Sequence, residues 1–258
     1  MADSNLAVER RGGVVWCALD RPPLNLLEPG LIGLLRSTFE TLARDASVRA
    51  AVVTGRGRAF TAGMDVNVLR DLDAASARAL ITELCAAIDA VHRAPFPVVA
   101  AVHGACLGAG FELALACDLR VAAANASFGL PEVRVGVPSV IQAALLPPLI
   151  GPGRAAEMLL LGTPVDAARA LAWGLVNRVV EPGALATAVD ETLAALLACA
   201  PGAVRAQKAL MIRWRETDLP SAVRAGIDAF VASYAGDEPR EGAAAFLEKR
   251  PPRFGGRT

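Results

Sequence analysis

The chain has 258 residues, of which 54% are hydrophobic and 20% charged. It is therefore long enough and apolar enough to bury a sizeable core, which excludes general disorder. Lys and Arg together number 26, as do Asp and Glu together, and this balance gives no general attraction to nucleic acid or to an anionic membrane. We therefore expect neither as a partner.

The first part of the chain alternates between strand and helix patterns. Residues 28–44 place Leu31, Leu34, Leu35, Phe39 and Leu42 at helical spacing, whereas residues 50–55 form a short buried run that ends at a glycine. Strands separated by helices predict an α/β fold with parallel pairing. The expected strands are 12–20, 50–55, 97–104 and the start of 119–129, and the expected helices are 28–44, 74–93 and 110–118.

After about residue 150 the pattern becomes mainly helical. Helices are expected at 154–162, 166–174 and 183–200, with one more strand at 176–180. Pro201 and Gly202 interrupt the chain, and residues 203–250 are expected to be helical with breaks at Pro220 and Gly236. The tail, 251–258, is expected to be extended. These signals predict one core, residues 1–200, followed by a helical C-terminal region, residues 201–258.

The cysteines and the N-terminus indicate a reduced, cytoplasmic protein. The cysteines are scattered, without the paired spacing of metal ligands, and we expect them to be reduced core residues. The N-terminal residues lack the apolar segment of a signal peptide, and the longest apolar runs are too short and interrupted to span a membrane. The five are Cys17, Cys85, Cys106, Cys117 and Cys199.

Two glutamates stand in informative surroundings. Glu112 lies in HGACLGAGFELALACD (103–118), in the first turn of an apolar helix, so its pKa should be raised by burial and by a second acid nearby. Glu132 lies in ASFGLPEVRVGVP (126–138), after a proline. Two such carboxyls suit the delivery and removal of protons. The plainer interpretation of Glu132 is an ordinary charge at a helix N-terminus.

Two glycine-rich turns accompany the glutamates. In GRAFTAGMDV (57–66), Gly63 permits a backbone conformation that directs the Met64 N–H into a cleft. In CLGAGFE, Gly108 and Gly110 flank Ala109 at the start of a helix, where free N–H groups favour negative charge. Two converging N–H donors form an oxyanion hole for a thioester or ester enolate. Alternatively, the glycines only allow tight packing of strand against helix.

The order AFTAGMD, then HGACLGAGFELALACDLRVAA, then FGLPEVRVGVP resembles the enoyl-CoA hydratase/isomerase (crotonase) superfamily. The resemblance extends over nearly the whole chain, through LDRPPLN, LLLGTPVDAARALAWGLVNRVV and FLEKR. It implies a ClpP/crotonase-like spiral of ββα units, with the active site in residues 1–200. It also implies that residues 201–258 build a homotrimer, usually paired as a hexamer, and contribute part of the CoA site.

The resemblance also implies roles for individual residues. The oxyanion amides would be those of Met64 and Ala109, and Glu112 and Glu132 match the two glutamates of members that hydrate enoyl-CoA. Glu112 would orient and deprotonate the water, and Glu132 would supply the proton to C2. Further contacts to substrate or CoA would come from Ala62, Gly63, Asp65, Asn67, Gly108, Phe246 and Lys249, the last two sometimes from a neighbouring subunit.

The expected reaction is reversible syn addition of water to a 2-trans-enoyl-CoA, as in fatty acid metabolism and β-oxidation. No metal or redox cofactor is expected, because coenzyme A belongs to the substrate. The family often has glycines where this chain has Ser139, Val140 and Ile141, so the acyl preference and the reaction stay open. Ala109 also replaces a frequent glycine, which a backbone donor should tolerate if φ remains negative.

Three other functions compete with hydration. The first is a different crotonase reaction, either isomerisation of the double bond or dehydration of a specialised hydroxyacyl-CoA. The second is a non-catalytic acyl-CoA-binding protein, against which the two glutamates argue. The third is a serine peptidase on the same spiral fold, disfavoured because His92 and His103 both suit structural positions and no serine has a nucleophile's surroundings.

Overall fold

The computed structural model describes residues 5–254, and its core is built on a six-stranded sheet in the order β1-β2-β3-β4-β6-β9. β1 and β2 form an antiparallel hairpin, whereas the other neighbouring strands run parallel, as predicted. The sequence analysis did not predict β1. The strands are β1 (Leu6–Arg11), β2 (Val14–Leu19), β3 (Ala50–Gly55), β4 (Val98–Val102), β6 (Leu119–Ala123) and β9 (Arg178–Val180).

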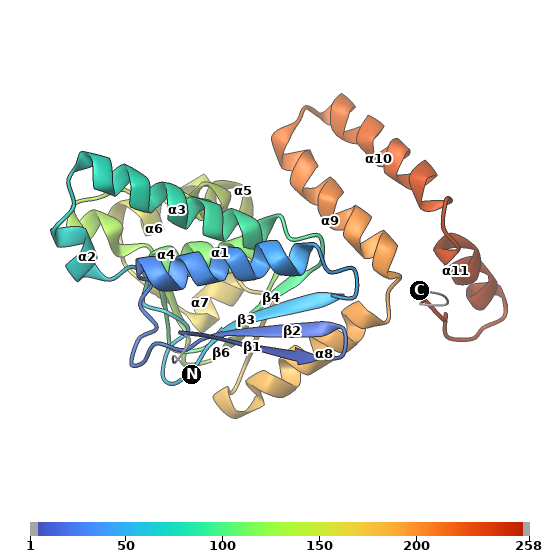
Figure 1. The fold of residues 1–258 in the computed structure, drawn as a ribbon, viewed down its shortest axis with the longest axis horizontal. Coiled ribbons are helices and arrows are strands. Elements are labelled where there is room, and N and C mark those ends of the chain that lie inside the picture. The colour runs from blue at the N-terminus through green and yellow to red at the C-terminus, as the bar shows by residue number, and fades with distance from the viewer. Residues whose placement is uncertain (1–4, 255–258) are drawn as a thin grey trace.

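Helices cover both faces of this sheet (Figure 1). In β3, Ala51 and Val53 face the larger core under α1 (Pro29–Ala43) and α3 (Ala74–His92), because successive side chains of a strand point to opposite faces. Ala50 and Val52 face the other way and pack with α8 (Leu185–Leu197). Burial on both faces explains why the central strands are continuous apolar runs.

A small second sheet determines where the two glutamates meet. It has the order β5-β7-β8, and its members are β5 (Ala105–Leu107), β7 (Ser127–Gly129) and β8 (Val165–Asp166). β5 and β7 pair in parallel, and they lead into helix α4 (Ala109–Ala116) and 3₁₀ helix η1 (Pro131–Val135), respectively. The parallel pairing therefore sets the first turns of α4 and η1, with Glu112 and Glu132, side by side.

The remaining elements of the core are short. Among the described residues no single helix is long and apolar enough to cross a membrane, although the segments 182–197 and 201–216 pass that test together as a pair bent by 103°. The short elements of the core are α2 (Val66–Arg70), η2 (Gln142–Leu145), α5 (Leu146–Ile150), α6 (Pro152–Leu161), α7 (Ala167–Ala172) and η3 (Pro182–Ala184).

Three C-terminal helices, α9 (Pro201–Glu216), α10 (Leu219–Ser233) and α11 (Glu238–Leu247), project from the core (Figure 1). The predicted break at Gly236 lies between α10 and α11, but the break predicted at Pro220 is wrong. The chain breaks at residues 217–218, and Pro220 lies in the first turn of α10, where a missing N–H costs no hydrogen bond. The extended tail is described only as far as residue 254, and residues 255–258 lie outside the described part.

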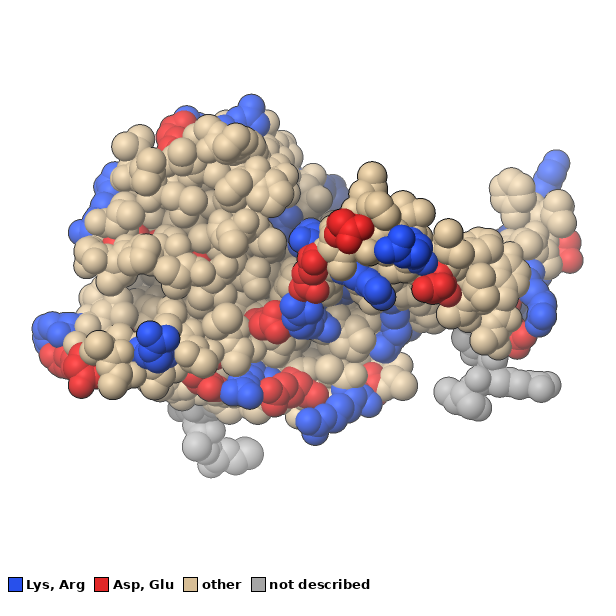
Figure 2. Space-filling model, turned by 90° about the horizontal axis from the view of Figure 1, so that it is seen from above, with Lys and Arg blue, Asp and Glu red and all other residues tan. Residues whose placement is uncertain are grey.

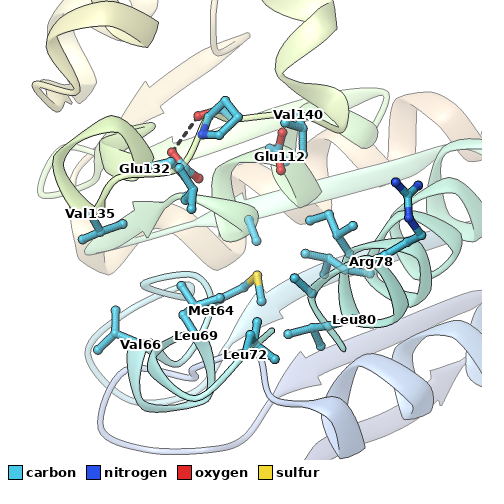
Figure 3. A pocket seen from close by; sticks show the side chains of 18 of the residues that line it. Met64, Val66, Leu69, Leu72, Arg78, Leu80, Glu112, Glu132, Val135 and Val140 are labelled. Carbon is cyan, nitrogen blue, oxygen red and sulfur yellow. Dashed lines mark hydrogen bonds between the residues drawn. The ribbon is translucent and has the colours of Figure 1, made fainter. Parts of the chain in front are cut away.

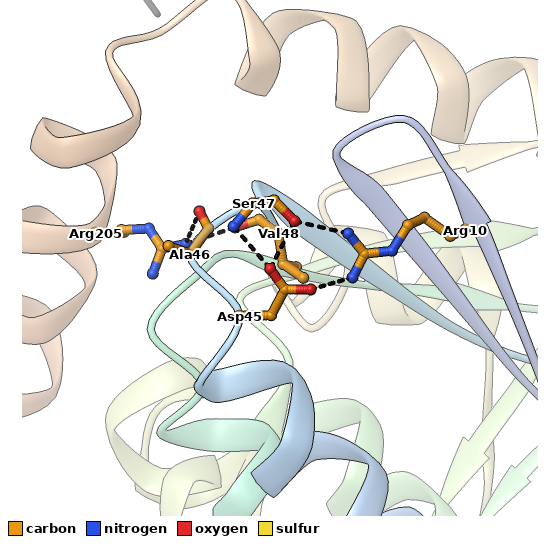
Figure 4. Close-up of polar contacts among 6 residues, drawn as sticks. All are labelled: Arg10, Asp45, Ala46, Ser47, Val48 and Arg205. Carbon is orange, nitrogen blue, oxygen red and sulfur yellow. Dashed lines mark hydrogen bonds and ion pairs between the residues drawn. The ribbon is translucent and has the colours of Figure 1, made fainter. Parts of the chain in front are cut away.

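α9 is fixed to the core by polar contacts from its buried side. Lys208 Nζ lies 2.7 Å from Asp118 Oδ2 and donates a hydrogen bond to the carbonyl of Phe96. Arg205 donates to the carbonyls of Ala46 and Val48 in the turn after α1. Figure 4 shows that turn, which is held in shape from its other side by the ion pair of Arg10 with Asp45 and by the Ser47 hydroxyl.

The helices α9 to α11 leave many apolar side chains uncovered. Figure 2 shows the C-terminal helices reaching beyond the core, with charged and uncharged side chains interspersed along them. Of the apolar positions in this region, Phe246 is 84% exposed and Phe230 66% exposed. Others of this exposed set are Met211, Trp214, Leu219, Val223, Ile227, Val231, Tyr234 and Leu247. A single chain therefore does not bury the apolar surface of this region.

Candidate active site

The turn at Thr61–Met64 has a backbone conformation that depends on glycine at position 63. Gly63 has φ +89°, and its N–H donates to the Thr61 hydroxyl at 3.0 Å. A Cβ atom on Gly63 would lie 2.7 Å from the carbonyl oxygen of Leu107, so only glycine fits against the second turn. The next N–H, that of Met64, donates no hydrogen bond to any residue in 5–254. It is therefore available to a ligand.

The turn at Gly108 packs directly on the first. Gly108 has φ +55° and precedes α4, and its ideal Cβ position lies 3.9 Å from Gly63 Cα. The N–H of Ala109, in the first position of α4, likewise has no acceptor among the described residues. Within the described chain only Asn25 and Lys249 combine a side chain with positive φ. Ala109 thus satisfies the condition under which its methyl group is tolerated.

Gly110 serves the tight packing of strand against helix, which was the alternative role considered for these glycines. Its φ is not positive, and a Cβ on it would lie 2.4 Å from Thr61 Cγ2 and 2.8 Å from the Thr61 carbonyl oxygen. Gly110 therefore lets α4 approach the 61–64 turn closely, whereas Gly63 and Gly108 set the turns themselves.

Glu112 is buried in the first turn of α4, with only 3% of its surface exposed. Its Oε1 accepts hydrogen bonds from the N–H groups of Ile141 at 2.9 Å and Ala143 at 3.0 Å, and the backbone of Val140 also acts on the carboxylate. Burial raises the pKa of Glu112 above its ordinary value, and the nearby Glu132 raises it further against the opposing effect of those amides. The predicted direction is confirmed.

Glu132 lies opposite, on η1, and is half-buried. Its Oε2 accepts a hydrogen bond from the Ser139 hydroxyl at 2.7 Å (Figure 3). Its Oε1 lies beside the second glycine turn, 3.0 Å from the ideal Cβ position of Gly108. Each glutamate therefore has one oxygen held by the protein, and Oε1 of Glu132 accepts no hydrogen bond within the described residues.

The two carboxylates and the two turns line one cavity of about 660 Å³ (Figure 3). Ala62, Met64, Gly108, Ala109, Glu112 and Glu132 all contribute to its wall. The rest of the wall is mainly apolar and includes Leu69, Leu72, Leu80, Ile81, Leu84 and Val140. The cavity thus combines a small polar end with an apolar space for a chain.

Several predicted residues lie beside this cavity or away from it. Asp65 caps α2 through the N–H of Asn67 and lies 3.5 Å from Arg21, so both Asp65 and Asn67 support the wall without forming it. Phe246 lies in the last turn of α11 and Lys249 in the turn that follows it, and neither lines the cavity of its own chain. Neither His92 nor His103 lines it, which argues further against a peptidase.

Sequence analysis missed two parts of the site. It noted Ser139 only as a departure from a family pattern, although this side chain bonds a predicted catalytic glutamate. It also missed the wall contributed by α3, although Ala77, Leu80, Ile81 and Leu84 recur at helical spacing and signal an apolar face. Among residues 5–254, no group of three or more His, Cys, Asp or Glu side chains is arranged to hold a metal ion.

Comparison with known proteins gives a consistent result. The family model described as "Enoyl-CoA hydratase/isomerase" matches residues 9–257. The chain is 35% identical to a crotonyl-CoA hydratase of Syntrophomonas wolfei, covering 98% of this chain and 99% of that one. It is 36% identical to a 2,3-dehydroadipyl-CoA hydratase of Escherichia coli, covering 98% and 100%.

Solved structures agree with the sequence comparisons. The crystal structure of an enoyl-CoA hydratase from Mycobacterium smegmatis superposes with a TM-score of 0.94 at 36% identity, covering 97% of this chain and 98% of that one. The structure of Pseudomonas aeruginosa DspI gives a TM-score of 0.93 at 35% identity, covering 99% and 100%. The fold is therefore the crotonase fold, as predicted.

Proposed function

Because the chain belongs to the enoyl-CoA hydratase/isomerase family, and is an enzyme of the enoyl-CoA hydratase type, we propose that it adds water reversibly and syn to a 2-trans-enoyl-CoA. The product is a 3-hydroxyacyl-CoA. The family implies an acyl-CoA thioester as substrate, and coenzyme A enters as part of it. The observation that carries the proposal is that two glutamates and two amides without an acceptor among the described residues line one mainly apolar cavity.

The two amides bind the thioester oxygen in this proposal. Hydrogen bonds from the N–H groups of Met64 and Ala109 polarise the carbonyl, make C3 electrophilic and stabilise the enolate-like charge that follows attack. The closeness of the two glycine turns supports this role, since the ideal Cβ of Gly63 lies 3.4 Å from Ala109 N.

The two glutamates then divide the proton transfers. Glu112 orients the water and removes its proton, and a carboxylate whose pKa is raised is a stronger base when ionised. Glu132 acts as the carboxylic acid and delivers its proton to C2, the carbon next to the carbonyl. The step leaves Glu112 protonated and Glu132 ionised, and transfer of one proton from Glu112 to Glu132 through water restores the starting state. The position of Glu132 Oε1 beside Gly108 supports this role, because Gly108 immediately precedes the Ala109 donor.

The C-terminal helices complete the site from a neighbouring subunit. Phe246 is exposed and lies away from its own chain's cavity, as does Lys249, so we assign their predicted contacts with coenzyme A to the cavity of an adjacent copy. The uncovered apolar side chains of α9 to α11 support a trimer or a pair of trimers. The division into a catalytic part, residues 1–200, and an oligomerising part, residues 201–258, follows from the same proposal.

The test is turnover of crotonyl-CoA, followed by the loss of the conjugated enoyl thioester and by chromatography of the hydroxyacyl product. Glu112→Gln and Glu132→Gln should each lower kcat by roughly 10²–10⁴ and leave coenzyme A binding nearly intact. Glu83→Gln is a matched control, because Glu83 is a half-buried residue of α3 that pairs with Arg36 outside the cavity.

Each outcome has a distinct meaning. A Glu112 or Glu132 variant that keeps more than about half of the wild-type kcat removes that residue from the mechanism. Movement of the double bond without hydration makes the chain an isomerase, and binding without any turnover makes it an acyl-CoA-binding protein. Short, medium, long and aromatic enoyl-CoA thioesters, tested side by side, then define the acyl preference.

A further inference from the structure

One short segment holds both carboxylates of the site, by two different means. The N–H groups of Ile141 and Ala143 bond to Oε1 of Glu112, so this support depends on the backbone and survives most changes of side chain. The Ser139 hydroxyl bonds to Oε2 of Glu132 at 2.7 Å, and this support depends on one side chain. Ser139 is the one hydrogen-bond donor to that carboxylate among residues 5–254.

A tight turn brings Ser139 back to Glu132. After η1 the chain reverses at Gly136, which has φ +86°, and the N–H groups of Gly136 and Val137 both donate to the carbonyl oxygen of Glu132. The backbone of Glu132 thus anchors the turn, and the side chain of Glu132 is bonded by the segment that leaves it. The hydroxyl is therefore set in place by the fold.

We propose that Ser139 is a positioning residue, whose hydroxyl holds Oε2 of Glu132 so that Oε1 is directed at the C2 carbon of the bound thioester. A glutamate side chain has three rotatable bonds, and the cavity wall around it is mainly apolar. Without the hydroxyl, the carboxylate has no described donor to select one rotamer, and proton delivery needs hydrogen-bond reach to the receiving atom. This inference rests on the proposed hydratase function.

The test is a double-mutant cycle between Ser139 and Glu132, measured as kcat and KM on crotonyl-CoA. Ser139→Ala should lower kcat about tenfold, because the carboxylate that forms as the proton leaves Glu132 loses its hydrogen bond, while KM stays within about twofold. Ser139→Thr, which keeps the hydroxyl, should recover most of the loss. In the Glu132→Gln background, Ser139→Ala should change kcat by less than about twofold, because residues that act as one unit are non-additive.

Ser37→Ala is the matched control, because it removes an exposed hydroxyl that bonds only within α1. Thermal unfolding of each variant identifies any loss of folding. The inference is overturned if folded Ser139→Ala keeps more than about half of the wild-type kcat, or if it loses the same factor in the Glu132→Gln background. Failure of the wild-type protein to hydrate any enoyl-CoA refutes the proposed function instead, so the two failures are distinguishable.

Discussion

Replacement of Gly63 by alanine tests whether the thioester is bound by backbone amides. The substitution keeps every N–H group but adds a Cβ at a residue with φ +89°. That Cβ would lie 2.7 Å from the carbonyl oxygen of Leu107, a backbone atom that cannot rotate away. One of the two glycine turns must therefore shift, and the Met64 and Ala109 donors then no longer converge on one oxygen.

Two separable costs follow from this geometry. A side chain held at positive φ costs of order 1–3 kcal/mol of folding stability. Loss of one oxyanion donor costs about 3–4 kcal/mol of transition-state stabilisation, a decrease in kcat of roughly 10²–10³. Gly151→Ala isolates the first cost, because Gly151 has φ +84° but no atom lies within 4 Å of its added Cβ. Met64→Ala isolates the contribution of the Met64 side chain, because the backbone N–H donor is kept.

The assay combines urea unfolding with crotonyl-CoA hydration by folded protein. We expect both glycine variants to lose stability, but only Gly63→Ala to lose kcat by two to three orders of magnitude. Met64→Ala should be mild for the chemical step, since it keeps its N–H. The reasoning is wrong if Gly63→Ala and Gly151→Ala have similar kcat, or if Met64→Ala is as damaged as Gly63→Ala.

Three further predictions concern stability and assembly. Burial raises the folded-state pKa of Glu112, so the wild type loses stability as the pH rises above the unfolded value of about 4.3. Glu112→Gln, whose Oε1 still accepts the two N–H groups, should therefore gain stability relative to wild type as the pH rises from 5 to 8. A difference in unfolding free energy between the two proteins that does not change with pH in chemical denaturation would contradict this. Lys208→Ala leaves the carboxylate of Asp118 without its buried cation and should cost about 3 kcal/mol in urea unfolding, whereas a loss below about 1 kcal/mol would show that the pair does not anchor α9. Sedimentation of the full chain should give a trimer or hexamer, and Phe230→Asp, at an exposed apolar position, should weaken this assembly. A wild-type monomer at micromolar concentration would refute the predicted assembly.

Local signals in the sequence were sufficient for much of the core and for several features of the site. The parallel strand at 50–55 and the helix over 74–93 were predicted close to their observed bounds, because burial on both faces and a 3.6-residue period are properties of a few neighbouring residues. The need for glycine's backbone freedom at Gly63, where φ is +89°, and the raised pKa of Glu112 were also predicted. Both depend on residue type and immediate surroundings. The roles assigned to these residues stay predictions.

Only the tertiary structure decided which residues meet. The strands β5 and β7 have three residues each and pair across a separation that includes α4 and β6, so no local pattern predicts them, although their pairing aligns Glu112 with Glu132. The contact of Ser139 with Glu132 depends on the left-handed turn at Gly136, and nothing in the sequence around Glu132 predicts this contact. Phe246 and Lys249 do not line the cavity of their own chain, and their assignment to the cavity of an adjacent copy stays a proposal. Secondary-structure propensity and the polarity pattern depend on a few neighbouring residues. A catalytic cavity depends on distances between residues far apart in the sequence, and only the packed chain determines these distances.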